Sequence, residues 1–115
     1  MPEEDSPIVI ERHESIIKDL KRLRRFHTIE RSLQHFEALL SDDYPNIGIP
    51  MQGFGDRELF KGDLHIENAG KQGRGAARVI YEKRTHTCQI IYVYAKNEDL
   101  REDKIRQVVN ERLCP

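Results

Sequence analysis

The stretch that decides the fold of this chain is Ala77-Arg78-Val79-Ile80-Tyr81, followed after a polar link by Gln89-Ile90-Ile91-Tyr92-Val93-Tyr94-Ala95. Both runs are rich in β-branched and aromatic residues, which favour the half-buried, pleated surface of a strand. The link Lys83-Arg84-Thr85-His86-Thr87 carries polar side chains and suits a solvated turn. We therefore predict an antiparallel hairpin with strands at 77–81 and 89–95.

Two further segments are typical of strands. Residues 59–66 alternate in polarity, so that Lys61, Asp63 and His65 share one face and the apolar side chains share the other. This pattern predicts an antiparallel strand with one solvated face. The run from Pro7 to Ile10 suits an edge strand, because a proline at the first position loses no ladder hydrogen bond.

Apolar residues recur at helical spacing in three segments. The first stripe consists of Ile16, Leu20 and Leu23, widened by Ile17, and the second of Ile29, Leu33, Phe36, Leu39 and Leu40. The third consists of Ile105, Val108, Val109 and Leu113, and follows Asp99 and Glu102 at capping-box spacing. Residues 42–55 are dense in turn residues and predict a long loop.

The predicted order is strand, two helices, three strands and a helix, a β-α-α-β-β-β-α arrangement of the α+β class. At 115 residues the chain forms a single domain, 1–115, in which residues 1–6 are expected to be a flexible acidic tail. Each apolar helix stripe needs a partner, so we expect the helices to pack on one face of a small antiparallel-rich sheet. The other face is expected to stay open.

Composition excludes several classes of function. The net charge of −1 removes the simple argument that a strongly basic protein binds nucleic acid. Cys88 and Cys114 form no disulfide framework and lack the spacing of a zinc site, so neither a metal nor another cofactor is expected. No apolar run approaches the ~20 residues of a membrane span. The N-terminus is acidic, unlike a signal peptide, and we expect a cytoplasmic protein.

Positive charge is concentrated just before and within the hairpin. Between Asn68 and Arg84 the chain has Lys71, Arg74, Arg78, Lys83 and Arg84 against Glu82 alone, a local excess of four. Lys71 and Arg74 lie in a glycine-rich turn, where small residues allow an RNA backbone to approach closely. The alternative is a solvated loop. A second basic run, from Lys18 to Arg25, suits the solvated face of the first helix.

The series Gly73-Arg74-Gly75, then Arg78-Val79-Ile80-Tyr81, then Tyr94-Ala95-Lys96-Asn97-Glu98 resembles the RelE/ParE superfamily of bacterial toxin-antitoxin toxins. The HigB/RelE-type branch is the most similar. By order of elements the resemblance covers nearly the whole chain, and by residues it covers 58–99. It implies a RelE-like fold and a ribosome-dependent mRNA interferase, an endonuclease that cuts mRNA without a metal as the ribose 2′-hydroxyl attacks its neighbouring phosphate. It also implies a cognate antitoxin, through which the complex binds operator DNA.

Matching motif positions assigns family roles to individual residues. Arg78 falls on the family's arginine at the start of its third strand, and Lys61 on a basic position of the preceding strand. Lys96 or Asn97 falls on the polar position that closes the last strand. We therefore take Arg78, Lys61, His65 and Lys96 as catalytic candidates, and Lys71, Arg74, Arg78 and Asn97 as RNA-binding candidates.

The proposed chemistry suits these residue types. An arginine fork is planar, charged and bidentate, and so matches a phosphate. Lys61 can contact phosphate or act as a base, and an imidazole such as His65 can give or take a proton near neutral pH. The alternatives are a pairing of Arg78 with Glu82 on its own strand, an incidental exposed His65, and Asn97 as a helix N-cap.

The chain also departs from the family pattern. Ala76-Ala77 stands where relatives often have glycine, and residues 100–115 lack the catalytic His or Tyr that several relatives place near the last helix. Tyr92 and Tyr94 are expected in the core, on the face of Ile90. The lack of a His or Tyr in residues 100–115 suits a ParE-like inhibitor of DNA gyrase that cuts nothing. A non-toxic RNA-binding or protein-binding module of the same fold is a further alternative.

Overall fold

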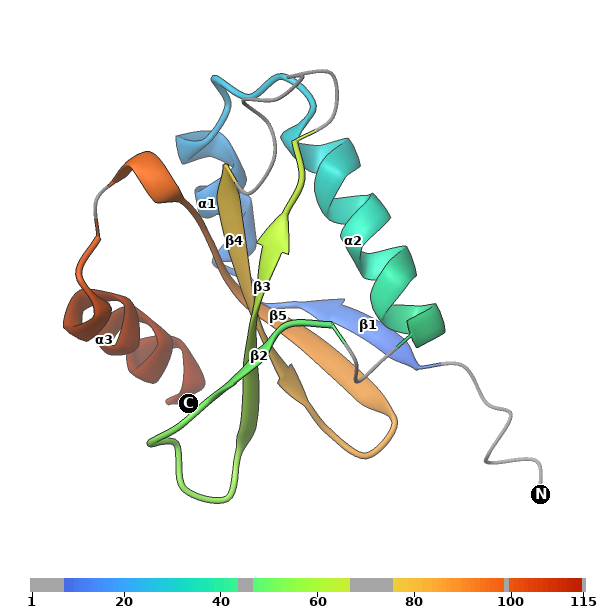
Figure 1. The fold of residues 1–115 in the computed structure, drawn as a ribbon, viewed down its shortest axis with the longest axis vertical. Coiled ribbons are helices and arrows are strands. Elements are labelled where there is room, and N and C mark those ends of the chain that lie inside the picture. The colour runs from blue at the N-terminus through green and yellow to red at the C-terminus, as the bar shows by residue number, and fades with distance from the viewer. Residues whose placement is uncertain (1–7, 44–46, 67–75, 99, 115) are drawn as a thin grey trace.

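The computed structural model describes residues 8–43, 47–66, 76–98 and 100–114, which confirm the α+β class (Figure 1). In chain order the elements are β1 (Val9–Arg12), α1 (Ile16–Arg22), α2 (Ile29–Asp43), β2 (Ile49–Met51), β3 (Glu58–Leu64), β4 (Ala77–Lys83), β5 (Thr87–Ala95), a short 3-10 helix (Lys96–Glu98) and α3 (Glu102–Leu113). Within these described segments, no helix has the length and apolar character needed to cross a bilayer.

The strands form one sheet in the order β1-β5-β4-β3-β2. The predicted hairpin is confirmed, because β4 and β5 pair antiparallel and place Arg78 opposite Tyr94. On its other side β4 pairs antiparallel with β3, which places Asp63 opposite Arg78. The first strand is an edge strand as predicted, and it runs parallel to β5. Asp63, Arg78 and Tyr94 therefore form one row across three strands.

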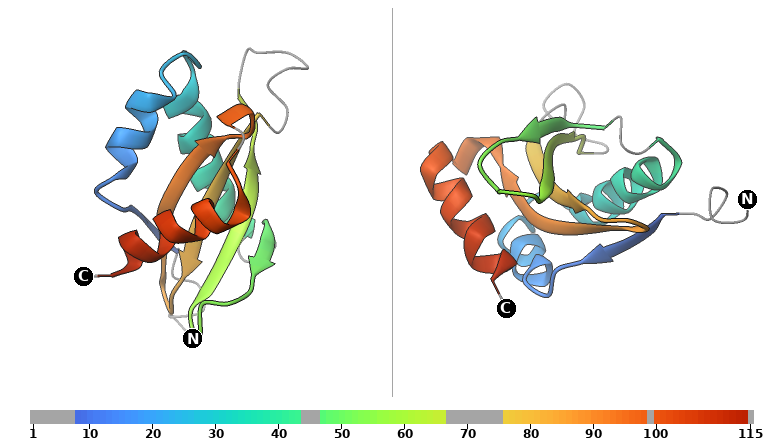
Figure 2. Two further views of the ribbon diagram at one scale, coloured as in Figure 1. Left: turned by 90° about the vertical axis from the view of Figure 1, so that its left-hand side faces the viewer. Right: turned by 90° about the horizontal axis from the view of Figure 1, so that it is seen from below.

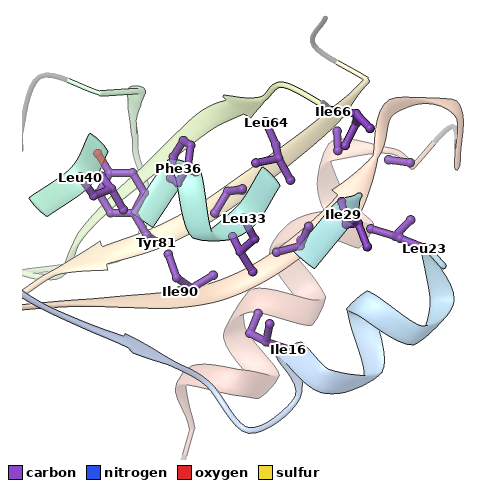
Figure 3. Packing of buried hydrophobic residues seen from close by; sticks show 14 of the residues in the cluster. Ile16, Leu23, Ile29, Leu33, Phe36, Leu40, Leu64, Ile66, Tyr81 and Ile90 are labelled. Carbon is purple, nitrogen blue, oxygen red and sulfur yellow. The ribbon is translucent and has the colours of Figure 1, made fainter. Parts of the chain in front are cut away.

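Helices cover both faces of the sheet, so the expectation that they pack on one face is wrong (Figure 2). Helices α1 and α2 cover one face, and the buried side chains between them and the sheet include Leu23, Leu33, Phe36 and Tyr81 (Figure 3). Helix α3 covers part of the opposite face through Ile105 and Val109. The reason lies in β4 and β5, which direct apolar side chains to both faces, so that both need cover.

A β-bulge in β5 decides which face its tyrosines occupy. Tyr81 pairs with Ile90 but its neighbour Ile80 pairs with Tyr92, so Ile91 is the extra residue. Ile90 packs in the core beneath α1 and α2, whereas Ile91, Tyr92 and Tyr94 pack beneath α3. The expectation that the tyrosines share a face with Ile90 is therefore wrong, because the inserted residue shifts the alternation by one.

Strand β2 lies inside the segment that was expected to be loop. It pairs antiparallel with β3, with Ile49 opposite Lys61 and Met51 opposite Leu59. Gly48, at φ +95°, precedes it, and a Cβ there would lie 2.9 Å from the carbonyl oxygen of Lys61. Glycine therefore lets β2 come close to β3 at this point. The strand is short, and its turn-forming composition concealed it.

Strand β5 continues past the end of β1, and side chains complete its hydrogen bonds there. Strand β1 pairs with β5 as far as Ile90. Beyond that point the bonds run from Arg112 to the carbonyl of Ile91 (2.9 Å), from the amide of Val93 to Asp19 (3.0 Å), from Arg22 to the carbonyl of Val93 (2.8 Å), and from the amide of Ala95 to Glu98 (2.7 Å). These side chains tie α1 and α3 to the sheet.

Candidate functional site

Charged and polar groups gather where β3, β4 and β5 meet the first turn of α3. We call them the Arg78 cluster, which consists of Lys61, Asp63, Arg78, Tyr94 and Glu102. Lys61 and Asp63 come from β3, and the other three from β4, β5 and α3, and the register of the sheet together with two ion pairs links them. Arg78 and Lys61, both predicted as site residues, lie in this cluster.

Arg78 occupies the centre of the row. Its Nε lies 3.5 Å from Oδ1 of Asp63, and its side chain keeps 30% of its surface exposed. The two Nη groups make no hydrogen bond to another described residue. The alternative that Arg78 pairs with Glu82 is wrong, because Glu82 is bound by Arg57 at 3.0 Å and Arg84 at 3.0 Å.

Lys61 reaches toward helix α3 rather than into solvent. Its Nζ lies 3.3 Å from Oε2 of Glu102, and the other oxygen of Glu102 lies 3.3 Å from Nε of Arg106. The carboxylate is thus held at both oxygens by cations while half of its surface remains exposed. This arrangement orients Glu102 and keeps one face of it open to a ligand.

Tyr94 lies beneath α3, directly across from Arg78. Its ring packs against Tyr92, with centroids 5.2 Å apart. Burial raises the pKa of Tyr94 to about 12, although the charge of Arg78 acts in the opposite direction. Its hydroxyl therefore stays protonated at neutral pH. The predicted core role of Tyr94 is confirmed.

His65 and Lys96 lie at the same end of the sheet, outside the ion-pair network. His65 is exposed just beyond the end of β3 and lines a pocket beside α2. Lys96 is exposed, and its amide donates to the carbonyl of Ala76 at 2.9 Å, which holds the end of β5 beside the start of β4. The catalytic roles of His65 and Lys96 remain predictions, which rest on the positions of the two residues alone.

The remaining predicted RNA-binding residues fall outside the described part of the chain. These are Lys71 and Arg74, together with the side chain of Asn97. The neighbouring described residues, Ile66 and Ala76, lie at the end of the sheet where β4 begins.

Sequence reasoning missed Glu102 and Asp63 as site residues. Asp63 was recognised as a polar-face residue, and Glu102 as a capping residue. Nothing near Glu102 in the sequence indicates Lys61, which lies 41 positions away. One signal was available for Asp63, since it shares a strand face with Lys61 and His65.

Among the residues that the structure describes, no three His, Cys, Asp or Glu side chains gather as metal ligands would. The Arg78 cluster itself offers an arginine fork, an amine, carboxylates and a phenol. Comparisons of the chain with protein-family models, with curated proteins and with solved structures found no match.

Proposed function

We propose that this protein is the toxin of a toxin-antitoxin pair, a ribosome-dependent endoribonuclease that cuts mRNA at the Arg78 cluster. The observation that carries the proposal is the position of Arg78, which is partly exposed in the middle of a polar row with Lys61 nearby. A cognate antitoxin is part of the proposal, as is operator binding through the antitoxin complex.

Arg78 is suited to bind the scissile phosphate. Its ion pair with Asp63 is 3.5 Å long, and the side chain of Asp63 is 65% exposed, so the pair is weak and easily exchanged. An incoming phosphate can take the two Nη groups in a bidentate contact. The same contact strengthens as negative charge builds on the phosphorus oxygens in the transition state.

Glu102 is suited to act as the general base. Its carboxylate is oriented by Lys61 and Arg106 and is half exposed, so a ribose 2′-hydroxyl can reach it. The proton moves to Glu102 as the 2′-oxygen bonds to phosphorus, and the bond from phosphorus to the 5′-oxygen breaks. His65 gives its proton to that 5′-oxygen. The products are a 2′,3′-cyclic phosphate and a 5′-hydroxyl.

Cleavage in cells tests the proposal. The chain is induced in a bacterial host and mRNA 5′ ends are mapped for the wild type, Arg78→Ala and Arg78→Lys. We expect new ends within translated codons in the wild type, none in Arg78→Ala, and weak cutting in Arg78→Lys, which keeps the charge and loses the fork. Arg24→Ala, an exposed arginine of the segment after α1, serves as the control and should cut like the wild type.

The outcomes separate the competing functions. Growth arrest without new RNA ends, accompanied by loss of gyrase supercoiling activity, would contradict the nuclease and support a gyrase inhibitor. Harmless expression of a folded protein would support a binding module instead. Folding of each variant is checked by its urea unfolding midpoint, so that a loss of cutting is assigned to the site rather than to the fold.

A further inference from the structure

In the part of the chain that the structure describes, the outer edge of β3 is open beyond the end of β2. Strand β2 pairs with β3 at Leu59, Phe60 and Lys61. From there β3 continues to Leu64, and no other described strand pairs with this side. In Figure 1, β2 accompanies the lower part of β3, and the upper part continues past it.

The direction of the backbone groups at this edge follows from Pro50. Proline has no N–H, so the pair of Pro50 with Phe60 cannot exchange ladder hydrogen bonds, and the bonded pair is the next one, Ile49 with Lys61. Backbone groups point to the same side at every second residue. The N–H and C=O groups of Asp63 therefore point to the open edge, as those of Lys61 point to β2. Continued past Leu64, where β3 ends, the same alternation directs those of His65 to this side as well.

An apolar pocket adjoins this edge. It has a volume of about 290 Å³ and mostly apolar walls, and it is lined by Ser32, His35, Phe36, Leu39, Asp63, Leu64 and His65. Leu39 is 46% exposed although it lies on the apolar stripe of α2. The pocket thus offers an apolar side chain a place directly beside a row of outward-pointing backbone groups.

We propose that this edge and pocket bind an extended segment of a partner protein, which adds a strand beside β3 and places an apolar side chain against Leu39. Outward N–H and C=O groups at every second residue match an extended backbone and no helix. Side chains of an added strand alternate in direction, so every second one faces the pocket. The proposal does not depend on whether the protein cleaves RNA.

The size of the edge favours a peptide segment over a second copy of the chain. From Asp63 to Ile66, two residues beyond the end of β3, the described chain spans at most roughly 13 Å. Pairing two copies through so short an edge buries far less than the ~1,000 Å² of a stable interface. An extended segment needs only a few residues of pairing and one anchoring side chain.

Selected peptides test the proposal. Random peptides of about ten residues, long enough for one strand, are displayed and selected against the wild-type protein. The best binder is synthesised and its affinity measured for the wild type, for Leu39→Lys and for Ile17→Lys. Ile17 is the matched control, because it is also an exposed apolar helix residue, 63% exposed, on helix α1. We expect Leu39→Lys to weaken binding about tenfold or more and Ile17→Lys to leave it unchanged.

Two further readouts identify strand addition. Binding should slow the hydrogen exchange of the amides of Asp63 and His65. Proline placed along the peptide should abolish binding at every second position, where the peptide N–H meets the edge, and be tolerated between them. The proposal is overturned by failure to select a binder, by equal binding to Leu39→Lys, or by a proline pattern of helical period. It is also overturned if the wild type forms a dimer that Leu39→Lys dissociates.

Discussion

Asp19 of helix α1 accepts a hydrogen bond from the backbone amide of Val93, with 3.0 Å between Oδ2 and the nitrogen. The carboxylate is fully buried. Its two oxygens also accept from Arg112, at 2.6 and 2.8 Å, and from Arg22 at 2.9 Å. A charged side chain thus stands where the next strand would pair with β5, and it joins α1, β5 and α3 at one point.

Removing the carboxylate of Asp19 should lower the stability of the fold. Asp19→Ala leaves Arg112 part-buried without its acid and the amide of Val93 without its acceptor. We expect the free energy of unfolding to fall by about 3–5 kcal/mol, as measured by urea denaturation. Asp42→Ala, at an exposed aspartate of α2, is the control. A loss below about 1 kcal/mol for Asp19→Ala would show that the network does not hold the helices to the sheet.

Gly62 leaves room for the ring of Phe36. A Cβ at position 62 would lie 2.9 Å from Cζ of Phe36, whose ring also packs edge-on against Tyr81. Gly62→Ala should therefore lower the free energy of unfolding by about 1–3 kcal/mol through overpacking. In a Phe36→Leu background the same change should cost much less, because the clash is gone. Equal costs in both backgrounds, from a double-mutant cycle of urea midpoints, would rule this explanation out.

The alkaline limit of stability should depend on Tyr94. Burial raises its pKa from 10.0 in the unfolded chain to about 12. Between these values the folded state keeps a proton that the unfolded state loses, so the free energy of unfolding falls as pH rises. Tyr94→Phe removes this contribution and should make the alkaline loss of stability shallower. The measurement is the urea midpoint at a series of pH values from neutral upward, and a wild-type slope in Tyr94→Phe would contradict it.

The loss of stability at acid pH should depend on Glu30. Hydrogen bonds from Arg12, at 2.9 and 2.7 Å, hold the pKa of Glu30 below its ordinary 4.5. The stabilisation is therefore present above pH 4.5 and is lost as pH falls through the lower folded value. Glu30→Gln should flatten the acid-side fall of the melting temperature. Glu14→Gln, at an exposed glutamate before α1, should retain the wild-type profile, and identical profiles for both variants would exclude the role of Glu30.

Glu102 separates the proposed chemistry from RNA binding. Glu102→Gln keeps the shape of the side chain and removes the base, so we expect cleavage to fall about 10²–10⁴-fold with little change in affinity for a non-cleavable, 2′-deoxy substrate. Its ion pair with Lys61 is half exposed, so stability should change by less than about 1 kcal/mol. Glu111→Gln on the exposed face of α3 is the control. Full cleavage by Glu102→Gln would assign the base elsewhere.

The hairpin of β4 and β5 was predictable because its signal is local. Successive β-branched and aromatic residues indicate a strand, and a polar link indicates a turn, whatever surrounds them. The stripes of α2 and α3 were predictable for the same reason, as were Arg78 and Lys61 as partly exposed strand cations. Strand β2 was not predictable, because three residues that include Pro50 carry no periodic signal, and its pairing depends on the approach of Gly48 to Lys61.

The sequence by itself determined the class of fold, the hairpin, and the strand faces that carry Lys61 and Arg78, since residue spacing alone sets these. The tertiary structure decided the rest. The bulge at Ile91 turned Tyr92 and Tyr94 toward α3, and that helix in turn brought Glu102 to Lys61. Contacts between residues far apart in the chain depend on strand register and packing, which no local sequence pattern predicts.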